Sequence, residues 1–207
     1  RAEAIKTLTD QEKETLKPIL DINLEKSEPI AEGPPRPFVQ KWTVDELLDA
    51  ANHDKVQRNF ERGREMFAAG ACFKCHRFAG EGGTIGPDLT GAGGRFNAQN
   101  LLESIIEPSK VISDQYASTM FILDDGRIVN GRVINLNGKN MMVLTDMTNP
   151  SNLTNVDRDT VEEMMPSKSS MMPTGLVDTL TKEEALDLLA YLRSGGNPDH
   201  ELFQKKD

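Results

Sequence analysis

The sequence predicts a mainly α-helical domain, with a small antiparallel β subdomain inserted in it and an N-terminal extension of helical and Pro-rich segments. Three observations carry this prediction. Amphipathic patterns with helix-capping residues occur before residue 118 and again after residue 168. Runs rich in β-branched residues, joined by turn signals, fill the interval between them, and prolines cluster near residue 30.

The composition is that of a soluble globular protein. The 207 residues include 37% hydrophobic and 28% charged residues, and no run of about 18 apolar residues predicts a membrane span. The formal net charge of −9 disfavours nucleic-acid binding, because neutralising phosphates requires clustered Lys and Arg. The sequence opens on Arg1, so we interpret the chain as a mature or excised fragment, and the absence of a leader says little about compartment.

Residues 1–57 are interpreted as an extension and linker. The signals are a capping box at 9–12, a Pro-rich stretch at 28–38, and a second capping box that opens a short amphipathic helix over 43–53. We expect this extension to pack loosely or to join the domain to a preceding one.

Three helices are predicted in the domain itself. The first runs from about residue 57 to 69 and leads into the cysteine motif. Asn97 caps the second, which Pro108 stops, and Thr181 with Glu184 forms a capping box for the third.

The middle of the chain, residues 118–168, is predicted to be a β subdomain. Turn signals at 124–126 and 137–138 separate three strands within 118–146, and residues 152–165 hold a fourth strand and a fifth. Because so few strands are not stable alone, we expect a small curled sheet lying against the helical part.

The stretch GACFKCHRFAG, residues 70–80, holds both cysteines of the chain. A thioredoxin-type redox pair needs a βαβ frame, which is missing, and a structural zinc site needs four ligands. The other histidines, His53 and His200, lie in polar terminal segments, and a disulfide across two residues would remove little chain entropy. A covalently held haem fits best, with Cys72 and Cys75 as thioether positions and His76 as the proximal ligand. From the motif alone, zinc and a redox disulfide remain alternatives.

A haem used for electron transfer generally has a second axial ligand, often methionine. The Met-Met-Pro tripeptides at 164–166 and 171–173 are candidates, and the second is favoured because it lies on a loop shortly before the last helix. The Gly-Pro turn within 83–91 is suited to present the carbonyl of Pro87 to the free ring N–H of His76.

The motifs CFKCH, GPDL, MMPTG and LTKEEALDLLAYLRS occur in that order, and they resemble a class I cytochrome c. The phrases IGPDLTGAGGRF and LLESIIEPSKVISDQY are similar to the Pirellula/Verrucomicrobium-type haem-binding domain, a C-terminal module of large secreted dehydrogenase-like proteins. The resemblance covers roughly residues 60–195. It implies a cytochrome c-like fold in which the helix at 58–69 crosses the helix at 182–194, with Gly63 and Phe67 meeting Leu188 and Tyr191.

For the site, the resemblance implies His76 as proximal ligand, the Pro87 carbonyl as its acceptor and Met172 as distal ligand. Arg95 corresponds to a basic residue near a haem propionate. The family shares the β insertion. The implied domains are the extension at 1–57, a first core part at 58–117, the β insertion at 118–168, and a second core part at 169–207 that carries the methionine loop and the last helix.

The resulting hypothesis is an electron-transfer module with one covalent haem c, rather than an enzyme. Its expected partners are a dehydrogenase as donor, either in the same parent chain or separate from it, and a cytochrome or oxidase as acceptor. Thioether attachment takes place outside the cytoplasmic membrane, so a periplasmic or otherwise exported setting is expected. The alternative is a haem-based redox or gas sensor, or a peroxidase-like enzyme, with a labile sixth ligand. Other sixth ligands considered are Met171, Met165, His53 and His200.

Overall fold

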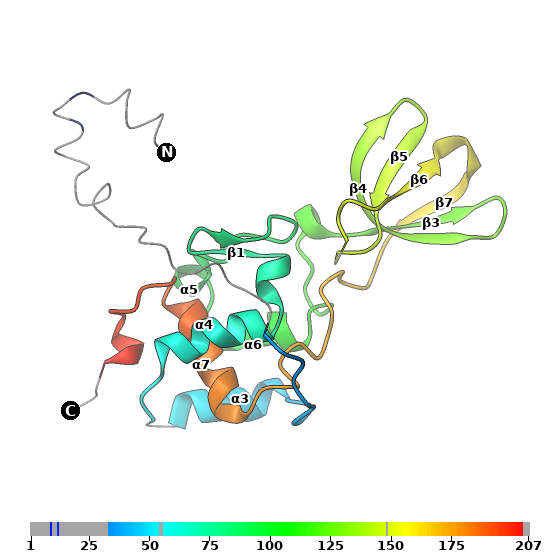
Figure 1. Ribbon diagram of the computed structural model, residues 1–207. Helices are drawn as coiled ribbons and strands as arrows, with labels where there is room; N and C mark the ends of the chain where they lie inside the picture. The colour runs from blue at the N-terminus through cyan, green and yellow to red at the C-terminus, as the bar shows by residue number, and fades with distance from the viewer. Residues whose placement is uncertain (1–8, 10–11, 13–32, 54–55, 148, 205–207) are drawn as a thin grey trace.

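The computed structural model describes residues 9, 12, 33–53, 56–147 and 149–204. It has two parts, a helical part and a β subdomain that stands off from it on two connecting segments (Figure 1). The capping box at 9–12 is formed, because the Thr9 backbone N–H donates to Glu12 Oε2 at 2.8 Å. The rest of residues 1–32 lies outside the described residues.

Helices occur where the sequence predicts them, and one further short helix, Ala92–Arg95, was not predicted. The helices are α3 (Val44–His53), α4 (Phe60–Ala69), α5 (Ala92–Arg95), α6 (Ala98–Ile106) and α7 (Lys182–Arg193). The side chains of Asn59 and Asn97 accept from the backbone at the starts of α4 and α6, and Thr181 with Glu184 completes the capping box of α7. Among the described residues, no helix is long and apolar enough to cross a membrane.

The core of the helical part is built around the crossing of α4 and α7 (Figure 1). Phe67 is fully buried, and its ring centroid lies 6.0 Å from that of Tyr191. A Cβ atom on Gly63 would lie 2.7 Å from Tyr191 Cβ and would overlap the backbone oxygen of Asp187. The crossing therefore depends on the missing side chain at residue 63, which faces Asp187 and Tyr191.

Helix α3 belongs to this core, although the sequence placed it in the extension. Leu47 is 1% exposed and Trp42, just before the helix, is 9% exposed. Both lie in the same hydrophobic cluster as Phe67 and Tyr191. The side-chain N–H of Trp42 donates to the Leu180 carbonyl at 2.9 Å. The part of the extension next to the domain thus packs tightly.

The β subdomain contains all five strands that the sequence indicated. They are β3 (Thr119–Leu123), β4 (Ile128–Asn137), β5 (Asn140–Leu144), β6 (Leu153–Asp157) and β7 (Val161–Pro166), and they form one antiparallel sheet in the order β6-β5-β4-β3-β7. A short 3₁₀ turn, Arg158–Thr160, joins β6 to β7. Strand content is therefore comparable to helix content in the described chain, and the expectation of a mainly α-helical domain with an inserted β subdomain is supported in part, for the residues outside that subdomain.

The sheet has its own core instead of sharing that of the helices. The pairing of β4 with β5 shifts between Val133 and Asn135, which bends the long strand. The sheet curls, so Phe121 of β3 and Val156 of β6 meet in one cluster, with Phe121 fully buried. At the base of the subdomain the Ser167 N–H donates to the Ser118 carbonyl at 2.9 Å, which joins the entering and leaving segments.

Candidate functional site

The cysteine motif forms a tight turn directly after α4. Ala71 has a left-handed backbone (φ 54°), unusual for a residue with a side chain, and it turns the chain into a 3₁₀ turn over Cys72–Lys74. The Cys72 carbonyl then accepts from the backbone N–H of both Cys75 (3.2 Å) and His76 (2.9 Å). These bonds hold the two cysteines and the histidine on one short, ordered loop.

Both thiols are free, and neither is activated. Burial raises the pKa of the Cys72 thiol to about 12, and burial also raises that of Cys75, although Lys74 opposes the shift. A redox-active pair has a lowered thiol pKa, so this environment disfavours thioredoxin-type chemistry. The described residues also contain no group of three or more His, Cys, Asp or Glu side chains that could hold a metal ion, so they do not supply a four-ligand zinc site.

His76 is held in one defined orientation. Its Nδ1 lies 2.9 Å from the carbonyl oxygen of Pro87. A carbonyl can only accept, so Nδ1 carries the proton and the lone pair of Nε2 is free for a metal ion. Burial lowers the pKa of His76, while the bond to Pro87 raises it, and the first effect is the larger.

Two glycines allow the loop around His76 to close. A Cβ atom on Gly86 would lie 2.8 Å from His76 Cε1 and 2.9 Å from Nδ1, so the loop backbone passes directly against the ring. The Gly86 N–H donates to the Cys75 carbonyl at 2.8 Å, and the Gly83 N–H donates to the Phe73 carbonyl at 2.7 Å. The loop predicted to present the Pro87 carbonyl is therefore fastened to the cysteine motif itself.

The candidate methionines fall in different parts of the molecule. Met165 lies in β7, paired with Met120 of β3, and is fixed within the β subdomain. Met171 and Met172 are half-buried and lie on the loop between β7 and α7. That loop passes the cysteine motif, because a Cβ atom on Gly70 would lie 3.5 Å from the Leu176 carbonyl oxygen and 3.3 Å from Cys72 Sγ.

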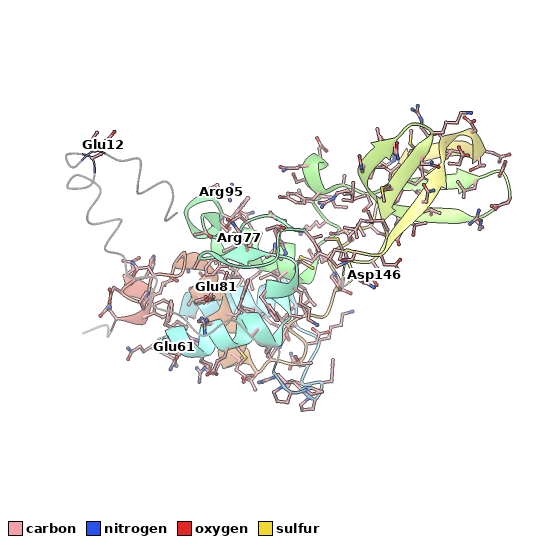
Figure 2. All side chains as sticks on the ribbon, turned by 45° about the horizontal axis from the view of Figure 1, so that its top comes forward. Glu12, Glu61, Arg77, Glu81, Arg95 and Asp146 are labelled. Atoms are coloured by element: carbon pink, nitrogen blue, oxygen red, sulfur yellow. The ribbon has the colours of Figure 1, made fainter. Side chains whose placement is uncertain are left out.

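The remaining candidate, Arg95, lies at the edge of the site. Arg95 is exposed on α5, its Nε donates to the Gly91 carbonyl at 3.3 Å, and both it and Arg77 lower the pKa of Asp88, after the larger effect of hydrogen bonds with Thr90. Figure 2 shows Arg77 and Arg95 on the same side of the helical part.

The two other histidines already have partners. His53 Nδ1 lies 3.0 Å from Asp49 Oδ1, and His200 Nδ1 accepts from the Leu202 N–H at 3.3 Å. His53 is the last residue of α3, and His200 directly precedes the 3₁₀ turn Glu201–Phe203.

Sequence reasoning missed one neighbour of the site. The backbone oxygen of Met147, on the loop between β5 and β6, lies 3.9 Å from Cys75 Sγ. The neighbouring Asp146 lies at the junction of the two parts in Figure 2. No local signal indicates this contact, because it joins residues that are 72 positions apart.

These residues fit a covalently attached haem. Two unpaired thiols lie in the turn that ends at an oriented imidazole whose Nε2 can bind iron. The class of protein that this arrangement supports is one that carries a covalently bound haem.

The comparison with known families agrees. Residues 60–125, less than half of the chain, match the family model of cytochrome c. The match supports a cytochrome c domain in this part of the chain, and the cofactor is a covalently attached haem c with its iron. No curated protein matches the chain.

Proposed function

We propose that the chain is a one-electron carrier in which Cys72 and Cys75 attach the haem, His76 is the proximal ligand and Met172 is the distal ligand. The observation that carries the proposal is the hydrogen bond of His76 Nδ1 to the Pro87 carbonyl, 2.9 Å long, because it leaves Nε2 for the iron. A haem with His and Met ligands exchanges single electrons with little change in geometry.

The residues of the chain then act by holding and orienting. The Pro87 carbonyl fixes the tautomer of His76 and increases the basicity of the ring as a ligand. The close approach of Gly86 prevents the ring from turning away from that carbonyl. The two thiols lie on one turn, so both attachment points and the proximal ligand move as a unit.

Met172 is preferred to its neighbours on position. Met165 is held in strand β7, whereas Met172 lies on a loop that returns to the cysteine motif before α7. The choice over Met171 rests on the resemblance, in which the methionine directly before proline is the ligand. Arg95 is proposed as the partner of a haem propionate, because its guanidinium is exposed beside the loop that holds Pro87.

The finer assignment is a haem-binding domain of the Pirellula/Verrucomicrobium type, with the insertion at residues 118–168 as part of that type. Its electron donor is proposed to be a dehydrogenase, either a separate protein or one joined through the segment before residue 58, and its acceptor a cytochrome or oxidase. The setting is proposed to be periplasmic or otherwise exported, since the thioether bonds are formed outside the cytoplasmic membrane.

The proposal is tested by replacing Met172 with alanine. Oxidised wild-type protein is expected to show the weak long-wavelength sulfur-to-iron charge-transfer band, and Met172→Ala is expected to lose it and to have a lower midpoint potential. Met171→Ala is the matched control and is expected to keep both. If Met172→Ala keeps the band, the ligand assignment is wrong. Rapid binding of carbon monoxide by the reduced wild-type protein would favour the sensor or peroxidase-like alternative.

A further inference from the structure

The segment of residues 36–42, which we call the strap, binds the chain just before α7. The backbone N–H groups of Val39 and Gln40 donate to the Asp178 carbonyl at 2.8 and 3.1 Å. Arg36 Nε donates to the Thr179 carbonyl at 3.3 Å. With the bond from Trp42 to Leu180, three consecutive carbonyls accept from the strap. This stretch has no strand partner, so the strap supplies what a neighbouring strand would otherwise supply.

Arg36 also forms hydrogen bonds with the first turn of α7. Its Nη2 lies 2.7 Å from Glu184 Oε1 and 2.6 Å from Oε2, so it contacts both carboxylate oxygens. The same Glu184 accepts from the Thr181 N–H at 2.8 Å in the capping box. Burial opposes ionisation of Glu184, but hydrogen bonds from Thr181 and Arg36 outweigh it and lower the pKa of the carboxyl. Arg36 thus ties the strap to the residue that starts α7.

The loop before α7, residues 170–180, is also held at its other end, near Ser170. The Met172 N–H donates to Ser170 Oγ at 3.1 Å, and the Ser170 N–H donates to Ser109 Oγ, just after α6, at 3.0 Å. The stretch from Ser170 to Leu180 has no regular secondary structure. Its position is therefore set by the Ser109 anchor at one end and the strap at the other.

We propose that the strap holds the Met172 loop in place and that Arg36 is a positioning residue for the sixth ligand. The inference rests on the proposed function, in which Met172 binds the iron. A ligand on a loop fixed at both ends returns to the iron each time the bond breaks, because its effective concentration stays high. Freeing one end of the loop lowers that concentration and lets an external ligand compete.

The test compares Arg36→Ala with Arg58→Ala in the full-length haem protein. Arg58 is the matched control, because its Nη1 lies 3.0 Å from Glu183 Oε2, in the same turn of α7, but it reaches there from the start of α4. Imidazole is added as the competing ligand, and its binding to the iron is measured by the loss of the charge-transfer band. Arg36→Ala is expected to bind imidazole at roughly ten-fold lower concentration than wild type, since a charge-assisted bond is lost. Arg58→Ala is expected to bind it as wild type does, with a lower melting temperature.

A second measurement separates failure of this inference from failure of the ligand assignment. Amide hydrogen exchange over residues 170–180 is expected to be faster in Arg36→Ala than in Arg58→Ala, whichever residue binds the iron. Unchanged exchange in that stretch, or equal imidazole binding by the two variants, would overturn the role of the strap. Faster exchange combined with a charge-transfer band that survives Met172→Ala supports the strap and rejects Met172 as the ligand.

Discussion

Replacing Gly63 by alanine tests the packing of α4 on α7, which brings the two ends of the helical part together. The new methyl carbon would lie 2.7 Å from Tyr191 Cβ and closer still to the Asp187 backbone oxygen. Ordinary carbon–carbon contacts are about 3.5–4.0 Å, so the helices must separate by roughly 1 Å. Neither obstructing atom can rotate away, because one belongs to the backbone and the other is attached to it.

The change in unfolding free energy caused by Gly63→Ala follows from two opposing effects. Overpacking of a tight core costs about 1–3 kcal/mol, whereas alanine is favoured over glycine in a helix by about 1 kcal/mol. Since the contact cannot relax locally, we expect the cost to be at the upper end and the net loss of unfolding free energy to be about 1–2 kcal/mol.

The assay is urea unfolding of the haem protein, followed by the fluorescence of Trp42, the single tryptophan, which lies in the affected core. Gly94→Ala is the control, because a Cβ atom there meets nothing within 4 Å. It is expected to leave stability unchanged or to raise it by up to about 1 kcal/mol. If Gly63→Ala were as stable as Gly94→Ala, the close approach of the two helices would be refuted.

Three further predictions concern other parts of the molecule. Gly86→Ala pushes the His76 ring off its carbonyl acceptor, weakens its basicity and is expected to raise the midpoint potential by roughly tens of millivolts; an unchanged potential in a redox titration would contradict this. Phe121→Ala is expected to lower the unfolding free energy of the β subdomain by about 3–5 kcal/mol, measured by circular dichroism. The urea unfolding curve followed by Trp42 fluorescence is expected to stay unchanged, because the two cores are separate. In haem-free protein, alkylation measured by mass spectrometry is expected to reach Cys75 before the more deeply buried Cys72, whose pKa of about 12 makes its rate rise about tenfold per pH unit from pH 7 to 10; equal rates would contradict the buried thiol.

Features that depend on neighbouring residues could be predicted from the sequence. The caps at Asn97 and Thr181 fixed the starts of two helices, because capping is a contact between residues three apart. The turn signals at 124–126 and 137–138 likewise located the strands. The bond between His76 and Pro87 was predictable because it closes a short loop of 11 positions.

Features that depend on contacts between distant parts of the chain could not be predicted from the sequence. Arg36 meets Glu184 across 148 positions, and an arginine in a Pro-rich stretch carries no local sign of its partner. The same holds for Met147, whose approach to Cys75 depends on where the whole β subdomain sits. The register shift in β4 that accompanies the curling of the sheet shows in the strand pairing and not in the hydrophobic pattern.

The central claim is that Cys72 and Cys75 carry the haem covalently. Wild-type protein from cells that attach haem c is expected to keep its haem through acid–acetone extraction and a denaturing gel. Its pyridine haemochrome spectrum is expected to be that of a haem with two thioether bonds. Cys72→Ser combined with Cys75→Ser is expected to lose the haem under the same treatment. Haem extracted from the wild type, or retained by the double variant, would contradict the account.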